Sequence, residues 1–263
     1  MTCGGGKIIN PVAFEIGYVK IRWYGILIGI AIILGLYLTI RESKKQGIDP
    51  DFFLDFFIYA IPVAIIGARI YYVIFRWQYY RNNIFRIIAL REGGLAIHGA
   101  IIGGLIVLLV MVKKRKINFW KTVDILSPPL VLGQAIGRWG NFINQEAYGK
   151  IVSKEFIEKF PEFIQKQMYI EGAYRSPTFL YESILNFSIF LFLFWWRRTN
   201  YKDGDIFLIY IITYSIGRFF IENMRTDSLM LGNLQIARII SFLMIMSGII
   251  LFYWRHRKGK NNA

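Results

Sequence analysis

The residues with the greatest chemical capacity in this 263-residue chain stand together between Gly137 and Glu146. They read Gly-Arg-Trp-Gly-Asn-Phe-Ile-Asn-Gln-Glu, so an arginine, two asparagines, a glutamine and a glutamate close a long apolar segment. A charged side chain at the centre of a membrane-spanning helix costs roughly 2.5–3.5 kcal/mol on insertion scales. A cluster of this kind therefore indicates a functional site. Arginine stays charged and binds phosphate oxygens bidentately, so a phosphate group is the ligand that we expect.

Two stripes of polar residues follow helical spacing through otherwise apolar segments. One stripe contains Tyr214, Arg218 and Glu222 at i, i+4 and i+8, followed by Arg225 at i+11. The other contains Gln134, Arg138, Asn141 and Gln145. Residues at these spacings share one face of a helix, so each stripe predicts a polar helix face directed away from lipid.

The elements that must position these residues are membrane-spanning helices. Of the chain, 55% is hydrophobic and 17% aromatic, and several apolar runs reach the roughly 20 residues needed to cross a bilayer. We predict an all-α, polytopic membrane helix bundle that forms one integral-membrane domain over residues 1–263. The seven predicted spans are Trp23–Ile40, Phe52–Phe75, Gly94–Val112, Val123–Ile143, Thr178–Trp196, Asp205–Glu222 and Leu234–Trp254.

Basic residues between the spans predict the orientation. Four segments are strongly basic: Arg41–Pro50, Lys113–Lys121, Arg197–Gly204 and Arg255–Ala263. They follow the first, third, fifth and seventh predicted spans, so all four lie on the same side of the membrane. Basic residues favour the cytoplasmic side, which places these segments in the cytoplasm and the N-terminus outside. The same rule accounts for the net charge of +15 without a nucleic-acid partner. The longest outer segment, residues 144–177, predicts a short extracytoplasmic helix or a pair of helices broken near Pro161.

With this orientation the polar residues of five different spans fall at one depth, in the outer half of the membrane. They are Tyr24, His98, Arg138, Asn141, Asn144, Gln145, Glu146, Tyr181, Glu182, Tyr214, Arg218 and Glu222. A phosphate headgroup of a lipid lies at this depth, so a lipid substrate reaches such a site without crossing the protein.

Other kinds of site do not fit the sequence. The chain has one cysteine, Cys3, which we interpret as an inert tail residue, and two histidines, His98 and His256. A disulfide framework within the chain is impossible, a Cys/His zinc site is not expected, and no Ser/His/Asp spacing is present. We predict no cofactor and no metal, and we expect the nucleophile of any reaction to arrive on a substrate.

Several of these residues also have a purely structural interpretation. Arg218 and Glu222 can form an ion pair, His98 can be a core histidine, and Tyr24 can belong to an interfacial aromatic belt. Three kinds of residue extend this interpretation: glycines that permit close helix packing (Gly93, Gly94, Gly99, Gly103, Gly104, Gly133, Gly137, Gly140), acids that cap or pair locally (Asp124, Glu182), and structural or snorkelling arginines (Arg69, Arg238).

Four motifs in this order resemble those of the prolipoprotein diacylglyceryl transferases of bacterial inner membranes. The motifs are Gly93–Gly99, in the form Gly-Gly-x-x-x-His-Gly, the ten residues Gly137–Glu146, the block Ser176–Glu182, and the stripe from Tyr214 to Glu222 with Arg225 and Asp227. The resemblance runs from Tyr24 to about Asp227. The chain departs from the family pattern at Ser176, where a histidine is expected, and at Ala100, where a second glycine is common.

The resemblance implies a multi-pass enzyme of the bacterial plasma (inner) membrane, with seven spans and the N-terminus outside. Its partners would be phosphatidylglycerol and a prolipoprotein signal peptide with a lipobox cysteine. It would transfer the diacylglyceryl group to the cysteine thiol and release glycerol phosphate. On this hypothesis Arg138 and Arg218 bind the phosphate, with Asn141, Asn144, Tyr24 and Tyr214 as further substrate-binding residues. The base that takes the thiol proton is His98, with Glu146 or Glu222 as the rival.

Two other classes of protein remain as alternatives. A transporter or channel for an organic anion would also carry polar groups in the membrane, but such folds typically show repeats and polar groups at the midplane. A transferase with a polyprenyl-phosphate donor would share the arginines, but an acidic metal-binding cluster is expected for a nucleotide sugar, and aspartate is scarce near the site.

Overall fold

The computed structural model describes residues 9–81, 84–89, 93–228, 230–232 and 234–260. Cys3 lies outside the described residues.

Long helices dominate, and each sheet in the described part of the chain is a two-stranded antiparallel hairpin. The long helices are α1 (Trp23–Lys45), α2 (Pro50–Phe75), α4 (Ile97–Arg115), α5 (Phe119–Asn144), α8 (Thr178–Trp196), α9 (Asp205–Ile221) and α10 (Ile236–Lys260). The short helices are α3 (Trp77–Tyr80), α6 (Lys154–Ile157), α7 (Glu162–Gln167) and the 3-10 turns η1 (Ile84–Ile88) and η3 (Glu222–Met224). The hairpins pair β1 (Val12–Ile16) with β2 (Val19–Arg22), β3 (Tyr169–Ile170) with β4 (Ala173–Tyr174), and β5 (Met230–Leu231) with β6 (Leu234–Gln235).

Each predicted span coincides with one of these long helices. Within the described residues, five helices are long and apolar enough to cross a membrane: α1, α2, α4, α8 and residues Ile236–Arg257 of α10. Helix α9 has only 17 residues, and α5 carries Lys121, Asp124 and Arg138 among its apolar residues. The structure therefore supports an all-α, multi-pass membrane protein.

The helices extend further into the basic segments than predicted. Helix α1 includes Lys44 and Lys45, and α4 ends with Lys113, Lys114 and Arg115. Cations in the last turn interact favourably with the negative end of the helix dipole, so the basic residues of the segments predicted to be cytoplasmic also prolong the helices.

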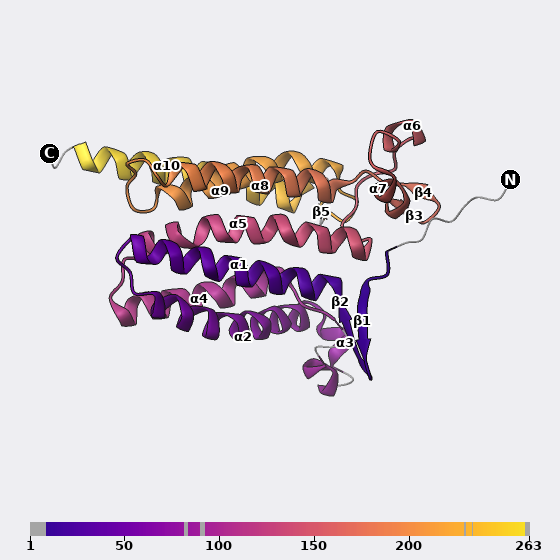
Figure 1. Ribbon diagram of the computed structural model, residues 1–263, viewed down its shortest axis with the longest axis horizontal. Coiled ribbons are helices and arrows are strands. Elements are labelled where there is room, and N and C mark those ends of the chain that lie inside the picture. The colour runs from indigo at the N-terminus through magenta and orange to yellow at the C-terminus, as the bar shows by residue number, and fades with distance from the viewer. Residues whose placement is uncertain (1–8, 82–83, 90–92, 229, 233, 261–263) are drawn as a thin grey trace. The chain divides into compact units, whose positions relative to one another are not determined.

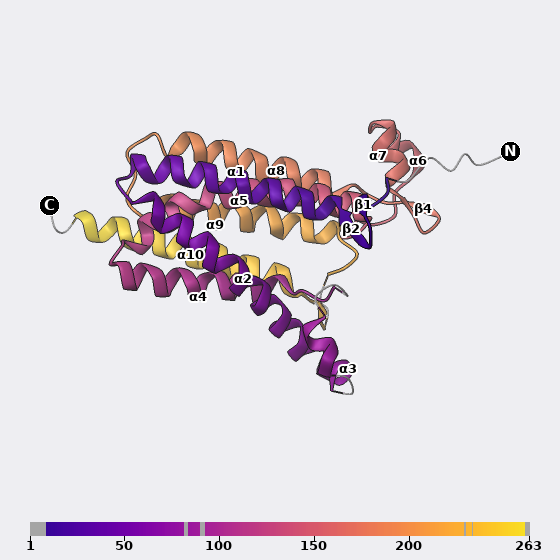
Figure 2. The ribbon, with the colours of Figure 1, turned by 60° about the horizontal axis from the view of Figure 1, so that its bottom comes forward.

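The chain divides into two compact units. The first contains residues 1–35 and 123–263, and the second contains residues 36–122. In the first unit α9 packs against both α8 and α10 (Figure 1). The hairpin β1–β2 leads directly into α1 in the same unit (Figure 2).

In the second unit α2 packs against α4. A Cβ atom added to Gly99 would lie 2.1 Å from the carbonyl oxygen of Gly67, and one added to Gly103 would lie 2.7 Å from that of Val63. These glycines permit the close approach of the two helices, as predicted, whereas Gly104 faces open space.

Polar side chains tie α5 to its neighbours in the first unit. Asp124 accepts hydrogen bonds from the backbone N–H groups of Gly204 (2.5 Å) and Phe207 (2.8 Å), so it caps the start of α9, in line with its structural interpretation. Near the other end of α5, the Trp139 indole donates to the Ser183 hydroxyl of α8. These contacts fix the rotation of α5 and thereby the direction of its polar stripe.

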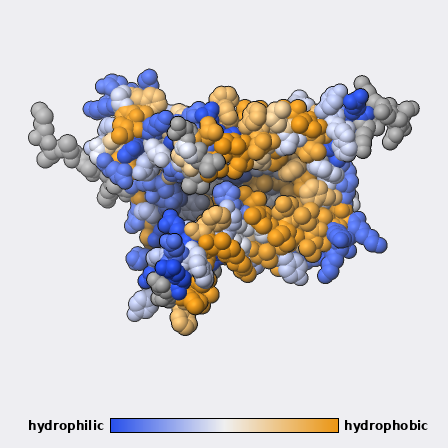
Figure 3. All heavy atoms as spheres, turned by 180° about the vertical axis from the view of Figure 1, so that it is seen from behind, coloured by the Kyte–Doolittle hydropathy of each residue, from blue (hydrophilic) through white to orange (hydrophobic). Residues whose placement is uncertain are grey.

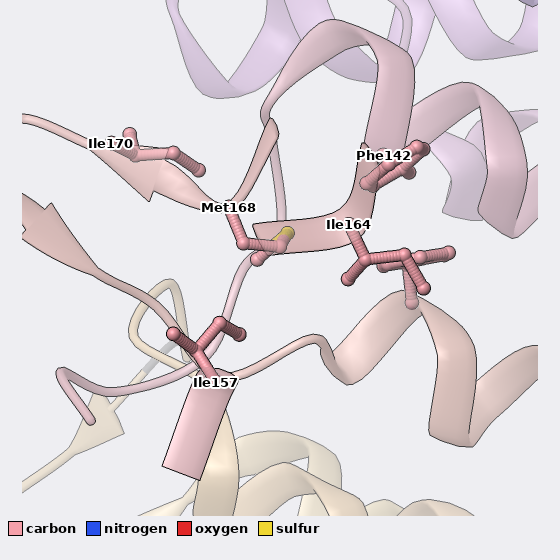
Figure 4. Close-up of a cluster of buried hydrophobic side chains, with 6 residues drawn as sticks. Phe142, Ile157, Ile164, Met168 and Ile170 are labelled. Atoms are coloured by element: carbon pink, nitrogen blue, oxygen red, sulfur yellow. The ribbon is translucent and has the colours of Figure 1, made fainter. Parts of the chain in front are cut away.

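The segment after α5 forms a small folded region with its own core. As predicted, it contains two short helices separated at Pro161, which precedes the first residue of α7. Its core is a cluster of buried apolar side chains (Figure 4): Phe142, Ile157, Ile164, Met168, Ile170 and Phe179. The buried Gln167 amide donates to the carbonyls of Phe142 and Ile143, which anchors this region to the last turn of α5.

The outward faces of the helices are apolar. Figure 3 shows hydrophobic side chains gathered over the helices and hydrophilic ones toward the helix ends. Ile33, Ile58 and Leu243 are each at least 60% exposed. A soluble protein rarely exposes so many large apolar side chains, whereas lipid solvates them without penalty.

Candidate functional site

A single carboxylate, Glu182, lies at the centre of the polar cluster of the first unit. It stands in the second turn of α8, and only 6% of its side chain is exposed. Its Oε2 atom is 2.5 Å from Nε of Arg138, and its Oε1 atom is 2.8 Å from a terminal nitrogen of Arg218 and 3.3 Å from one of Arg225. One buried carboxylate therefore gathers three guanidinium groups from α5, α9 and the turn that follows η3.

Two of the three arginines have a second carboxylate partner. Arg218 is 2.7 Å from Glu222, one turn further along, and the side chain of Glu222 is only 2% exposed. Arg225 donates to both oxygens of Asp227, at 2.9 and 2.5 Å. Burial disfavours the charged form of Arg225, but its hydrogen bond to Asp227 and the charge of Glu182 outweigh burial, so its pKa lies above the ordinary value.

Two arginines of the cluster, Arg138 and Arg218, are partly exposed. Three arginines and the carboxylates of Glu182, Glu222 and Asp227 are formally neutral together; Arg138 and Arg218 are each 21% exposed and Asp227 is 47% exposed, while the other two carboxylates are buried. The buried acids hold the guanidinium groups of Arg138 and Arg218 at the partly exposed side of the cluster. This arrangement suits an anion that presents several oxygen atoms.

A narrow pocket lies between α5, α8 and α9 beside these groups. Its walls are formed by Arg138, Glu182, Leu185, Asn186, Tyr214, Arg218 and Ile221. The pocket has room for roughly one water molecule, so a lipid headgroup does not fit inside it. The exposed edges of the two guanidinium groups, not the pocket, are therefore the surface that a headgroup would meet.

The end of α5 forms a hydrogen-bonded chain that starts at Arg138. A terminal nitrogen of Arg138 donates to Asn141 Oδ1 at 3.4 Å, and Asn141 donates to Glu146 Oε1 at 3.0 Å. Asn144 donates to the same carboxylate oxygen at 3.4 Å. The structure thus brings together Arg138, Asn141, Asn144 and Glu146, which the sequence predicted to belong to one site.

The backbone that presents Glu146 adopts an uncommon conformation. Gln145 has φ of +53° and Ala147 of +55°, both in the left-handed region that non-glycine residues seldom occupy. The backbone N–H of Glu146 donates to the carbonyl of Asn141, and the Thr178 hydroxyl donates to that of Ala147, so α8 and α5 together hold this turn. Backbone strain of this kind is concentrated at functional sites.

The two predicted tyrosines lie beside the cluster. The Tyr24 ring packs on Gly140, where an added Cβ would lie 2.3 Å from the ring, and its hydroxyl is within electrostatic range of Glu146 and Arg138. Tyr214 lines the pocket with both arginines and packs against Tyr210 at 5.8 Å between ring centroids.

His98 belongs to the second unit. It is the second residue of α4, is exposed, and stacks on Tyr71 with ring centroids 5.7 Å apart. Because the arginines lie in the first unit, its role alongside them stays a prediction.

Two members of the cluster were not predicted as site residues. Both residues belong to the motifs that resemble the family, but Glu182 was interpreted as a local cap or ion-pair partner, and Arg225 was given no role in substrate binding or catalysis. The available signal was the position of Glu182 at the same depth as the arginines, but the sharing of one carboxylate by three arginines is a tertiary fact. Among the described residues, no group of three or more His, Cys, Asp or Glu side chains is arranged to hold a metal ion.

Comparisons with known proteins show the family of the chain. The family model described as "Prolipoprotein diacylglyceryl transferase" matches residues 11–254. A phosphatidylglycerol–prolipoprotein diacylglyceryl transferase of Bacillus velezensis is 52% identical over 257 residues, which cover 97% of this chain and 95% of the relative. Proteins of the same name from Bacillus licheniformis (49% identical, covering 96% and 94%) and Halalkalibacterium halodurans (50%, covering 95% and 88%) are similar over almost the same length. With this match over nearly the whole chain, the protein belongs to the prolipoprotein diacylglyceryl transferase family.

Proposed function

We propose that this protein transfers the sn-1,2-diacylglyceryl group of phosphatidylglycerol to the lipobox cysteine of a prolipoprotein, the first step of lipoprotein maturation. The relatives named above are phosphatidylglycerol–prolipoprotein diacylglyceryl transferases. The observation that carries the proposal is the group of three guanidiniums on the buried Glu182, two of which, those of Arg138 and Arg218, are partly exposed.

In the proposed reaction the cysteine sulfur attacks the glyceryl carbon that bears the phosphate ester. A carbon–sulfur bond forms, the carbon–oxygen bond to phosphate breaks, and its electron pair leaves on glycerol phosphate. The thiol proton, with an unperturbed pKa of about 8.5, passes to a base. Negative charge grows on the leaving phosphate, which is where Arg138 and Arg218 would act.

The buried carboxylates would act as positioning residues in this scheme. Glu182 and Glu222 are buried, and their carboxylates already pair with guanidinium groups. They are therefore poor candidates for the base. Asn141 and Asn144 would hold Glu146 and, through Asn141, orient Arg138.

This leaves His98 and Glu146 as candidates for the base, and we favour His98. An imidazole has an unperturbed pKa of about 6.5, close to the operating pH, as a general base requires. If the assignment holds, His98→Gln loses turnover while Glu146→Gln retains part of it. Appreciable turnover in His98→Gln would transfer the role to Glu146.

We further propose that all seven long helices cross the bacterial plasma (inner) membrane, with the N-terminus outside and the region 144–177 extracytoplasmic. Helices α5 and α9 are less apolar or shorter than a helix that spans the membrane alone. Their polar stripes face the site instead of lipid, so both helices can still cross the membrane as part of the bundle. The lipid and the lipobox would then enter from the outer leaflet.

The experiment is mass spectrometry of a synthetic lipobox peptide incubated with the purified protein and phosphatidylglycerol. We expect a mass gain of one diacylglyceryl group on the peptide cysteine and no gain on a matched Cys→Ser peptide. An unmodified peptide, from protein shown to be folded, would overturn the proposal and would call for anion-flux measurements in liposomes.

A further inference from the structure

Arg69, in the second unit, directs its whole guanidinium group at the backbone of one loop. It lies in α2 and is only 5% exposed. The group has five N–H donors, and five carbonyl oxygens accept from it. The Nε atom donates to the carbonyl of Ile87 at 2.7 Å. One terminal nitrogen donates to the carbonyls of Gly93 (2.5 Å) and Gly94 (3.0 Å). The other terminal nitrogen donates to those of Arg86 (2.6 Å) and Ala89 (3.3 Å).

This contact set distinguishes Arg69 from a snorkelling residue. A snorkelling arginine extends its charged end to water, whereas the guanidinium of Arg69 is buried among carbonyl dipoles and lies 5.2 Å from the Tyr80 ring. Charge-assisted hydrogen bonds are the stronger ones, and five from one group fix the carbonyls relative to each other. Residues 86–89 and 93–94 are therefore held to α2 through one side chain.

The two glycines at the end of the loop fit this function. Gly93 and Gly94 have φ of +82° and +77°, which lets both carbonyl oxygens point at the same nitrogen of Arg69. A Cβ atom on Gly94 would lie 2.6 Å from that nitrogen and 2.7 Å from the Tyr72 ring, while one on Gly93 would meet nothing within 4 Å. The backbone conformation of the glycine pair that precedes α4 therefore matches the position of the Arg69 guanidinium.

The loop leads directly to His98. The Ala96 N–H donates to the carbonyl of Ala68, next to Arg69, and α4 begins at Ile97. His98 follows in the first turn and stacks on Tyr71 of α2. Among the described residues, the start of α4 is thus tied to α2 through Ala68 and Tyr71, and it follows directly on the glycines that Arg69 binds.

We propose that Arg69 is a positioning residue for His98: by binding five carbonyls of the preceding loop, it fixes where α4 begins and how the His98 imidazole is presented. The importance of Arg69 for turnover rests on the proposed function, in which His98 takes the thiol proton. The effect of Arg69 on the position of the His98 imidazole does not depend on that function. A lysine cannot replace it, because an ammonium has three donors at one point instead of a planar fork of five.

The test compares Arg69→Lys with Arg81→Lys, the same chemical change at an exposed arginine of the same unit. The chain has only two histidines, so a His256→Gln background leaves His98 as the single imidazole for 15N-histidine NMR of the full-length protein in nanodiscs. We expect Arg69→Lys to move the His98 signals and their titration midpoint and to lower kcat by about ten- to a hundredfold, with the KM for lipid nearly unchanged. Arg81→Lys should change neither readout.

A second matched pair covers the case in which Arg69→Lys does not fold. Gly93→Ala and Gly94→Ala carry the same strain from positive φ, but only the second pushes on Arg69. Gly94→Ala should therefore move the His98 signals further than Gly93→Ala does. Unmoved His98 signals in a folded Arg69→Lys or Gly94→Ala protein would overturn the proposal, whatever the activity. Moved signals with unchanged turnover would uphold the positioning and instead refute His98 as the base.

Discussion

At the scale of single residues, the site depends on how the buried Glu182 positions its arginine partners. Its Oε2 atom pairs with Arg138, and its Oε1 atom pairs with Arg218 and Arg225. Removing one partner of a buried ion pair is strongly destabilising because the other charges stay behind uncompensated. The three arginines would then repel one another and lose the geometry that a phosphate requires.

Glu182→Gln tests this dependence. The amide keeps the shape but loses the charge, so we expect the protein to lose about 3 kcal/mol of stability and the lipobox-peptide assay to fall by about a hundredfold. Glu171→Gln is the matched control, because Glu171 is 69% exposed and pairs with Arg175 and the Tyr148 hydroxyl, not with the three arginines of the cluster. Activity of Glu182→Gln within about twofold of the unchanged protein would show that the arginines need no shared carboxylate.

The phosphate clamp makes a separate prediction for Arg138→Ala and Arg218→Ala. Each change removes a donor from the place where charge grows on the leaving group, and we expect turnover to fall by at least about a hundredfold with membrane insertion unchanged. Arg175→Ala serves as the control, since the partners of Arg175 are Glu171 and the Tyr148 ring instead of the carboxylates of the cluster. Near-normal turnover in either of the first two variants would refute the clamp.

At the scale of elements, the packing of α1 against α5 positions Tyr24. Gly140 has no side chain, and the Tyr24 ring occupies the space where one would stand. One turn earlier, Gly137 is only in ordinary contact with Ile28, at 3.9 Å from the added Cβ. The two glycines of the same motif therefore have different steric requirements.

Gly140→Ala should displace Tyr24, whereas Gly137→Ala should not. We expect the first change to destabilise the protein by about 1–3 kcal/mol, the usual range for overpacking, and to lower turnover about tenfold. The second should stay within twofold in turnover and close to the unchanged melting temperature. Equal effects of the two substitutions, measured by thermal unfolding and the peptide assay, would contradict the steric argument.

At the scale of the whole molecule, the orientation in the membrane decides which leaflet supplies the lipid. Lys114 lies in the last turn of α4, in a segment that we place in the cytoplasm, and Lys159 follows α6 in the segment that we place outside. Both side chains are exposed, so a cysteine at either position should be accessible from its own side of the membrane.

Single-cysteine labelling in a Cys3→Ser background measures this orientation. In spheroplasts a membrane-impermeant maleimide should label Lys159→Cys at once and Lys114→Cys only after permeabilisation. Lys202→Cys, between α8 and α9, is a second cytoplasmic position and should behave like Lys114→Cys. The reverse pattern would invert the topology and move the arginine cluster to the cytoplasmic leaflet.

Hydrophobic runs and local signals predicted much of the architecture. The run Thr178–Trp196 was predicted with the bounds that α8 has, because apolar composition and flanking basic residues are properties of one segment. The break at Pro161 was equally local. The hairpin β1–β2 was not predicted, since four or five residues of mixed polarity carry little periodic signal.

The sequence by itself determined that this protein is a multi-pass membrane protein with polar residues gathered toward one site, and its motifs pointed to its family. It also supplied Arg138, Asn141, Asn144 and Glu146, which lie within one turn or two of each other along the chain. Only the tertiary structure decided that Glu182 is the common partner of arginines 36 to 44 residues away, and that Arg69 binds the loop before His98. Helical spacing reports which residues share a face of one helix, but the partner across the interface depends on how each helix is rotated and how deeply it packs.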